Sequence, residues 1–398
     1  MISKKLLIVN IEASINLDSK TRSLREPLPH INKSTLSLTR NWIEEIKIDL
    51  EKLMIEPSIP TNFIEQEAKD ASLYYSQAWL NLITTLYRYQ IIPLLTADQA
   101  RQTTGFLPLC LIQSSLTGRR LVALPFSDYC PLLASDDDAA NALITQAIDL
   151  AQQKKVRYLE LRTGTNEILA RHTDLVEENL YVRWLLPLSA DPDAAWSRLR
   201  KPVQHQIKKS RKLGVQVRIA QQREDVEHYY QLHLQTRCKK QGMPAQPAQF
   251  FYGLWDNFAA NGMMQLLLAE YEGNIIGGMV LLVSGTTVRY SYGASSERYL
   301  HLAPNNLLMW TAITWGCEHG CQVLDMGRTA HENEGLMEFK RRWGASQEPL
   351  PYYYYPATAG LAATSEQSRK FLLLTNCWRH LPVKVAGPLG GHLYRHLG

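Results

Sequence analysis

Residues 325–344 read DMGRTAHENEGLMEFKRRWG, and this stretch decides the fold. The apolar run at 322–326 that leads into it predicts a strand. Asp325 then lies near the C-terminal end of that strand, where sites in open α/β sheets tend to form. After the glycine turn, apolar residues recur at i, i+3 and i+7, namely Leu336, Phe339 and Trp343. That spacing predicts a short helix with one apolar stripe, and Lys340 lies beside the stripe.

The residues before this stretch predict a mixed sheet around an antiparallel meander. Three apolar runs separated by turns that contain Gly or Asn indicate strands, because such turns need positive φ; they lie at 264–271, 275–283 and 286–293. A strand at 215–220 and helices at 223–241 and 247–261 precede them, and a helix at 304–318 follows. The order β-α-α-β-β-β-α-β-α-β indicates an α/β (α+β) protein.

The first part of the chain repeats this pattern. Residues 141–161 and 306–326 both read as a long helix, a basic or glycine stop, and a strand ending apolar-acid-apolar, so that Glu160 corresponds to Asp325. Upstream strands predicted at 91–95, 105–112 and 121–126 match the meander. We therefore expect two similar domains with flanking segments: an extension at 1–60 that holds one short helix at 42–54, domains at 61–190 and 191–360, and a tail at 361–398.

This order of elements resembles the GNAT acyltransferase fold, present twice, and tandem GNAT domains are similar to the FemAB family of acyl- and aminoacyltransferases. The resemblance covers about residues 65–398 and rests on several stretches together, among them SQAWLNLI (76–83), GRRLVALPFSDYCPLL (118–133), IKKSRKLGVQV (207–217), AEYEGNIIGGMVLLV (269–283) and VLDMGRTAHENEGLMEFKRRWG (323–344). The segment WRHLPVKVAGPLG (378–390) looks like tails found on the family's polysaccharide-associated relatives. The resemblance implies two tandem GNAT-like domains, each a mixed sheet with a central meander flanked by helices.

Composition narrows the class of protein. The 398 residues are 45% hydrophobic, and a formal charge of +5 does not by itself indicate nucleic acid. The six cysteines are scattered without a C-x-x-C pair, which argues against a zinc site or a disulfide framework. No apolar run approaches the roughly 18 residues of a membrane span. We expect a cytoplasmic protein without a transmembrane segment or metal, in which His331 is a solvated loop residue.

The residues of the opening stretch have two interpretations each. Lys340 and Arg328 are candidates to neutralise a phosphate or a developing oxyanion, and Asp325 is a candidate proton acceptor. The resemblance supports this, because the family's Phe-Lys pair lies at the acyl-transfer centre and is here Phe339-Lys340. The alternatives are a solvated helix whose lysine pairs with the glutamates of the preceding acidic patch, and a strand-end carboxylate that accepts backbone N–H bonds.

Two further sets of residues are candidates for substrate contact. Tyr290 and Tyr292 alternate along a predicted strand, so both are expected on one face where they line a cleft; the alternative is ordinary strand packing. In the loop PFSDYCPLL (125–133), Asp128 and Tyr129 follow a strand. The FemAB resemblance implies that this loop faces the acceptor, with Asp128 as substrate contact or base, whereas Ser-Asp is also good turn chemistry.

Residues 198–218, RLRKPVQHQIKKSRKLGVQVR, hold eight Lys or Arg and no acid. They predict a helix from Pro202 that is closed by Gly214, and its Lys208, Lys209 and Arg211 are candidates to bind phosphate. A nucleotide-sugar pyrophosphate, a lipid-linked pyrophosphate or tRNA would each neutralise them. The alternative is a solvated helix near the domain junction.

The tail is the other segment that could face an anionic partner. Residues 371–398 mix Leu, Trp and Tyr with basic residues, so they are candidates for peripheral contact with the inner face of a membrane, near lipid-linked substrates. The alternative is that the tail packs on the second domain.

The acyl donor is the open question that the sequence poses. CoA-dependent GNAT enzymes place a glycine-rich loop before the helix after the third meander strand, yet residues 295–308 contain no glycine, and residues 134–143 are acidic. FemAB-like proteins share that absence and use aminoacyl-tRNA. We expect no tightly bound cofactor and transfer of an acyl or aminoacyl group, from aminoacyl-tRNA or acyl-CoA, to an amine or hydroxyl of a cell-envelope peptide or glycan precursor. Alternatives are an acetyl-CoA-dependent N-acetyltransferase and a non-catalytic module that binds a glycan or a partner.

Overall fold

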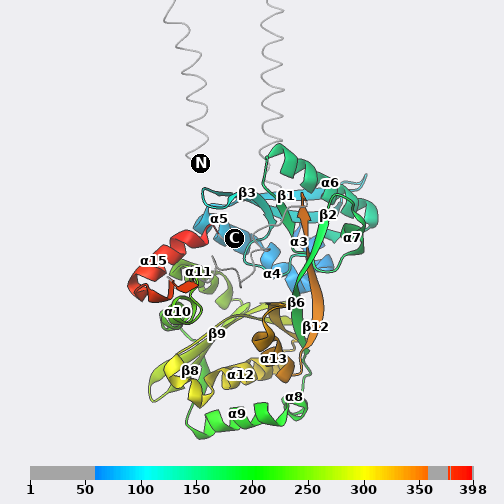
Figure 1. Cartoon of the computed structure of the whole chain (residues 1–398). Helices are drawn as coiled ribbons and strands as arrows, with labels where there is room; N and C mark the ends of the chain where they lie inside the picture. Colours follow the sequence, from blue (N-terminus) through cyan, green and yellow to red (C-terminus); the bar gives the residue numbers. More distant parts are fainter. Residues whose placement is uncertain (1–58, 357–374, 377, 397–398) are drawn as a thin grey trace, which may run out of the picture. The chain divides into compact units, whose positions relative to one another are not determined.

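The first half of the structure, residues 59–187, consists of short helices followed by a meander (Figure 1). This computed structural model describes residues 59–356, 375–376 and 378–396, so the helix expected at 42–54 lies outside the described residues. The helices are α3 (Thr61–Glu67), α4 (Ser72–Tyr75), α5 (Gln77–Tyr87), α6 (Asp137–Gln153) and α7 (Glu167–Arg171). The strands are β1 (Gln90–Ala97), β2 (Thr103–Ser114), β3 (Gly118–Ala123), β4 (Leu133–Ala134), β5 (Leu159–Leu161) and β6 (Val176–Pro187). The three meander strands predicted in this half are confirmed.

The second half, residues 188–356, follows the predicted order of elements closely. Its helices are α8 (Pro192–Arg198), α9 (Lys201–Lys212), α10 (Asp225–Leu234), α11 (Ala248–Leu254), α12 (Pro304–Glu318) and α13 (Glu334–Arg342). Its strands are β7 (Gln216–Ile219), β8 (Met264–Tyr271), β9 (Asn274–Ser284), β10 (Thr287–Ser295), β11 (Val323–Ala330) and β12 (Ser346–Tyr355). Helices α10 and α11 continue as π-helical turns and stop before Gly242 and Gly262, whose positive φ angles of 68° and 70° end each helix.

Both halves share one pairing pattern, as the repeat predicted. Strands β1-β2-β3 and β8-β9-β10 are antiparallel meanders, and each is followed by a parallel partner, β5 beside β3 and β11 beside β10. The parallel ladders are short. Leu121 and Val122 pair with Leu159 and Glu160, and residues 287–289 pair with residues 323–325. Beyond these pairs the strands are no longer joined, which leaves room for side chains between them.

The two halves are joined into one sheet by an exchange of strands. The sheet has twelve strands in the order β1-β2-β3-β5-β12-β6-β11-β10-β9-β8-β7, with β4 paired to β2. The last strand of the second half, β12, thus lies between β5 and β6 of the first, and β6 lies between β12 and β11. Figure 1 shows β6 and β12 side by side. The expectation of one sheet for each domain was therefore wrong. The segment 176–187 had not been predicted as a strand, and it is the element that connects the halves.

The described part of the predicted tail packs against both halves. Helix α15 (Val383–Tyr394) lies beside α10 and α11 (Figure 1). Lys239 donates to the carbonyl oxygens of Arg379 at 3.0 Å and Leu381 at 2.6 Å, and the Tyr89 hydroxyl donates to the carbonyl oxygen of Arg395 at 2.8 Å. This agrees with the packed alternative. A search of the described helices finds none long and apolar enough to cross a membrane.

Candidate active site

A polar cavity of about 190 Å³ opens where β10 and β11 stop pairing. It receives side chains from both halves of the chain and from α15: Tyr74, Phe126, Ser127, Asp128, Arg162, Gln246, Leu282, Arg289, Ser291, Tyr292, Arg328 and Tyr394. Three arginines face one carboxylate across this space, and the buried Ser291 hydroxyl has no hydrogen-bond partner among the described residues. Guanidinium donors and an unpaired hydroxyl favour an anionic or carbonyl-bearing ligand.

Asp325 is the anchor beneath the cavity. Its side chain is fully buried and accepts from Arg183 at 2.8 Å, from Arg289 at 2.5 Å and from the backbone N–H of Gly327 at 2.8 Å. Burial alone would raise the pKa of Asp325, but the two guanidinium groups and the N–H bond lower it to about 2. Because this carboxylate is fully engaged, the geometry favours the alternative interpretation, a strand-end carboxylate that accepts backbone N–H bonds, over a proton acceptor.

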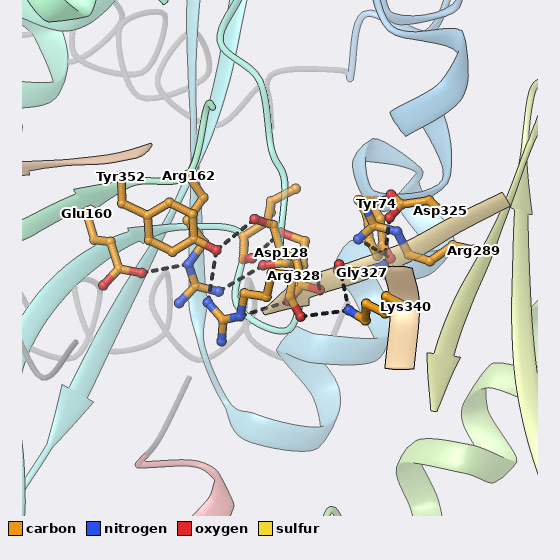
Figure 2. Close-up of polar contacts among 12 residues, drawn as sticks. Tyr74, Asp128, Glu160, Arg162, Arg289, Asp325, Gly327, Arg328, Lys340 and Tyr352 are labelled. Carbon is orange, nitrogen blue, oxygen red and sulfur yellow. Dashed lines mark hydrogen bonds and ion pairs between the residues drawn. The ribbon is translucent and has the colours of Figure 1, made fainter. Parts of the chain in front are cut away.

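Asp128 and Arg328 connect the two halves across the cavity (Figure 2). The Arg328 Nε lies 3.2 Å from the Asp128 carboxylate, and the Arg328 backbone N–H donates to it at 3.3 Å. Both side chains are about one-third exposed, at 35% and 33%. Burial raises the pKa of Asp128, but Arg328 and Arg289 outweigh burial and hold that pKa below its usual value. Asp128 is therefore an ionised carboxylate that solvent or a ligand can reach.

The loop that carries Asp128 is fixed from behind. Arg162 donates to the carbonyl oxygen of Ser127 at 3.0 Å and is itself paired with Glu160 at 2.6 Å. The Tyr352 hydroxyl donates to the carbonyl oxygen of Asp128 at 2.7 Å. Phe126 has a φ of 67°, a strained value for a residue with a side chain, which persists where the surroundings over-determine it. The loop is thus held in one conformation with its carboxylate toward the cavity.

Lys340 supports the strand that carries Arg328. Its ammonium donates to the carbonyl oxygens of Gly327 at 2.9 Å and Arg328 at 3.2 Å, and the residue is 2% exposed (Figure 2). Burial lowers the pKa of Lys340 to about 8. It does not line the cavity and forms no ion pair with a described residue, so the predicted pairing with the nearby glutamates is not observed. Phe339 packs in the apolar core of the second half, against Trp343.

The two tyrosines predicted on one face lie on opposite faces. The β10–β9 register shifts between Tyr290 and Tyr292, which is the signature of a β-bulge, and such a bulge turns the following side chain over. Tyr292 faces the cavity, whereas Tyr290 packs with the core of the second half. The prediction that both line one cleft was therefore wrong. Tyr129 lies outside the cavity, with its ring under the Arg183 guanidinium at 4.6 Å.

The basic helix forms, but away from the cavity. Helix α9 packs on α12 through buried Val203 and Ile207, and none of its residues lines the cavity. Lys208 and Arg211 are exposed and Lys209 is half-buried, and Lys208 lies 5.7 Å from the ring of Trp196. Its cations thus form a surface of their own, whose ligand the fold does not define.

The segment where a GNAT enzyme cradles CoA has a different structure here. Residues Glu297–Leu302 form a 3-10 helix, Ala303 has a left-handed φ of 56°, and Pro304 begins α12 without an N–H. The N–H groups of Asn306 and Leu307 point back to the carbonyl oxygen of Ala303. These donors are engaged within the chain, so the site fits a CoA pyrophosphate poorly. Among the described residues, no group of His, Cys, Asp or Glu has the arrangement of a metal site.

Several cavity residues were missed by the sequence analysis, namely Arg162, Arg289, Tyr74 and Tyr394. Two of them had a signal. Arg289 is a charged residue within a strand of otherwise alternating pattern, TTVRYSYG, and Arg162 follows the strand residue Glu160 that corresponds to Asp325. Tyr74 and Tyr394 had none, because their place depends on how α4 and α15 pack.

Comparisons with known proteins agree with this geometry. Residues 197–341 match the model of the acetyltransferase (GNAT) domain family. The chain is 33% identical over 94 residues to the lipid II:glycine glycyltransferase of Staphylococcus epidermidis, and 34% identical over 79 residues to that of Staphylococcus aureus. These matches cover 22% and 18% of this chain and only 23% and 19% of the relatives, so they span a small part of either protein.

Solved structures extend the likeness over most of the chain. FemX superimposes with a TM-score of 0.60 at 16% identity, covering 77% of this chain and 97% of FemX. L-PGS from Bacillus licheniformis gives a TM-score of 0.52 at 13% identity, covering 81% and 96%. At these identities the structures show the fold alone. Together with the match of residues 197–341 to the family model, they identify the GNAT fold. The chain is a distant relative of FemX and the FemAB proteins, as its motifs had indicated.

Proposed function

We propose that the chain is an acyltransferase that moves an acyl or aminoacyl group to an amine, or a hydroxyl, of a cell-envelope peptide or glycan precursor. The observation that carries the proposal is the Asp128–Arg328 pair. An ionised carboxylate from one half and a guanidinium from the other meet at the cavity where β10 and β11 stop pairing. The name of the matched relatives, lipid II:glycine glycyltransferase, supports the choice of acceptor.

The residues divide into those that face the reacting groups and those that position them. Acyl transfer forms a bond between the acceptor nitrogen and the acyl carbon and breaks the bond from that carbon to the donor's oxygen or sulfur. The acceptor ammonium, oriented by Asp128, first loses one proton to solvent and becomes a nucleophilic amine. As the amine attacks, Asp128 receives its second proton and passes it to the leaving group. Arg328, with Arg289 and Arg162, stabilises the oxyanion that develops on the acyl group.

Lys340 and Asp325 act one step removed. Lys340 holds the backbone at Gly327 and Arg328, and Asp325 holds Arg289 and Arg183. The proposal therefore makes them positioning residues. Lys208, Lys209 and Arg211 on α9 are proposed to hold a phosphate of the donor or acceptor. We propose that three further residues contribute indirectly, by packing around the site: Tyr129, Phe339 and Tyr290.

The donor is proposed to be an aminoacyl-tRNA rather than acyl-CoA, because Pro304 at the start of α12 has no N–H and the N–H of Asn306 is engaged with the carbonyl oxygen of Ala303. A cytoplasmic location, where charged tRNA and envelope precursors occur together, is part of the same proposal. We also propose that two domains, at 61–190 and 191–360, are the units of the repeat.

The test is acyl transfer by purified protein and its Asp128→Asn variant. We would supply an envelope precursor extract with a charged tRNA pool or with acetyl-CoA, and measure label entering the precursor. Removal of a general base costs roughly 10²–10⁴-fold in rate. The matched control is Asp174→Asn, a carboxylate that is 63% exposed in the same half. Transfer from acetyl-CoA alone would make the chain a CoA-dependent N-acetyltransferase. No transfer from either donor would leave a binding module of the same fold, whereas equal rates in both variants would refute the role of Asp128 as the base.

A further inference from the structure

The C-terminal segment 378–396 crosses from the second half of the chain to the first, and we call it the strap. It begins where Lys239 binds the carbonyl oxygens of Arg379 and Leu381. It ends on the first half, where the fully buried Arg120 donates to the carbonyl oxygen of His396 at 2.9 Å. The strap therefore spans both halves that enclose the cavity.

Close backbone contact holds α15 in place along the strap. A Cβ added at Gly390 would lie 3.0 Å from the backbone nitrogen and 3.2 Å from the carbonyl oxygen of Ala245. A Cβ at Gly391 would lie 3.0 Å from Pro247. Glycine at these positions lets the helix approach more closely than any other residue would, so the docking of α15 is specific in position.

The end of the strap is anchored by polar groups. The imidazole of His396 is 2.9 Å from the Ser114 hydroxyl, in a buried contact, and the Tyr89 hydroxyl donates to the carbonyl oxygen of Arg395. Buried hydrogen bonds of this kind fix the residues beside them, because breaking one leaves a polar group unsatisfied. Both bonds follow Tyr394 in the chain and the close contacts at Gly390 and Gly391 precede it, so its position is set from both sides.

Tyr394 lines the cavity that holds the Asp128–Arg328 pair. Its ring stacks on Phe126 with 5.3 Å between ring centroids and 24° between planes, and lies 6.4 Å from the ring of Tyr87. Phe126 precedes Asp128 by two residues in the loop with strained backbone. The stacked rings of Tyr394 and Phe126 thus form an aromatic wall of the cavity beside the Asp128–Arg328 pair.

We propose that Tyr394 is a specificity-determining residue that limits the size of the acyl group accepted beside Asp128 and Arg328. The inference rests on the proposed function of this cavity. Tyr394 forms part of the wall of this cavity of about 190 Å³, so the bulk of its side chain sets how much room is left for an acyl or aminoacyl group. Because the strap is held at both ends, the wall cannot yield to a larger group without undocking.

The experiment measures binding without turnover. Glycinamide, alaninamide and leucinamide carry the side chain of an aminoacyl group and a carbonyl that does not react, and their dissociation constants are measured by NMR titration. A pocket rejects an oversized group by roughly 10–200-fold. We expect wild-type protein to bind leucinamide at least about 10-fold more weakly than glycinamide, Tyr394→Phe to keep that ratio, and Tyr394→Ala to bring it near one.

Two further variants separate the wall from general damage. Tyr394→Trp thickens the wall and should weaken alaninamide relative to glycinamide, the opposite direction from Tyr394→Ala. Gly390→Val should undock α15 and relax the ratio as Tyr394→Ala does, whereas Val385→Ser, at a residue 50% exposed on the same helix, should leave it unchanged. A ratio that stays constant in Tyr394→Ala and Tyr394→Trp overturns the inference, as does wild-type protein that binds none of the amides.

The outcomes also separate this inference from the proposed function. Size selection that moves with Tyr394 in a protein without transfer activity would uphold the inference for a binding pocket and remove the transferase. Transfer activity whose selectivity ignores Tyr394 would do the reverse.

Discussion

Replacement of Asp325 by asparagine tests the electrostatic anchor of the site. Asparagine keeps the shape of the side chain and can still accept the Gly327 N–H, but it removes the charge between Arg183 and Arg289. All three charged groups are shielded from solvent, with exposed fractions of 0%, 16% and 9% for the side chains of Asp325, Arg183 and Arg289. The two guanidiniums would then face each other without a counter-charge.

The magnitude follows from two routes. The pKa of Asp325 falls from 3.8 to about 2. At about 1.4 kcal/mol per pKa unit, ionised pairing thus contributes roughly 2 kcal/mol to stability. Breaking a buried pair from one side costs roughly 3–5 kcal/mol, because the remaining charge stays buried. We expect Asp325→Asn to lower the free energy of unfolding by about 3 kcal/mol near neutral pH.

The stabilisation by ionised Asp325 depends on pH in a defined direction. Because the folded-state pKa lies below the unfolded value, the contribution is fully present above about pH 4 and is lost as pH falls towards about 2. The difference between wild type and Asp325→Asn should therefore shrink over that window, measured by urea unfolding at several pH values. Glu338→Gln is the control, since Glu338 pairs with Arg341 and Arg342 on the surface and should cost under about 1 kcal/mol. Equal costs for the two variants, or a difference that does not change with pH, would refute this account.

Three more predictions concern the strand that carries Arg328. Gly327→Ala, at a φ of 74° with its Cβ 3.3 Å from the Asp128 carboxylate, should destabilise the fold by about 1–2 kcal/mol and reduce transfer, which thermal unfolding and rate assays would show together. Wild-type protein should gain stability between about pH 8 and 10.5, because over that range the folded protein has lost the Lys340 proton while the unfolded chain still binds it, and Lys340→Met should remove this gain. Urea unfolding across that pH range measures it, and a parallel gain in both proteins would count against the prediction. Tyr352→Phe removes a hydroxyl that bonds both Arg328 and Asp128, so transfer should fall while the melting temperature changes by only a few degrees; a large loss of stability with unchanged rate would contradict the role.

The sequence predicted the local elements well because local rules govern them. The meander β8–β10 follows from turn glycines, and α12 begins at Pro304 as expected from proline at the first turn. Asp128 was found from its place after a strand, and the family resemblance pointed to the same loop. These are features of short segments, so they can be read without knowing how the segments pack.

What the sequence did not reveal depends on tertiary packing. The bulge between Tyr290 and Tyr292 reverses a face that strict alternation would assign, and no residue type marks it. Lys340 looks like a surface lysine on an amphipathic helix, yet it is buried because the carbonyl oxygens of Gly327 and Arg328 on β11 lie within its reach. Position along the helix gives the direction of a side chain, whereas the partner comes from another element.

The exchange of β6 and β12 decides how the two halves share the chemistry. Arg183 on β6 reaches Asp325 only because β6 pairs with β11, and Tyr352 on β12 bonds both Asp128 and Arg328 because β12 lies between β5 and β6. Two ion pairs join the halves, Asp128–Arg328 and Arg183–Asp325. Either half alone would hold one charged partner of each pair without the other. A first half that supplies Asp128 and Arg183 is more than a scaffold for the second. The cavity exists only when the two halves are joined in one sheet, because residues of both halves line it.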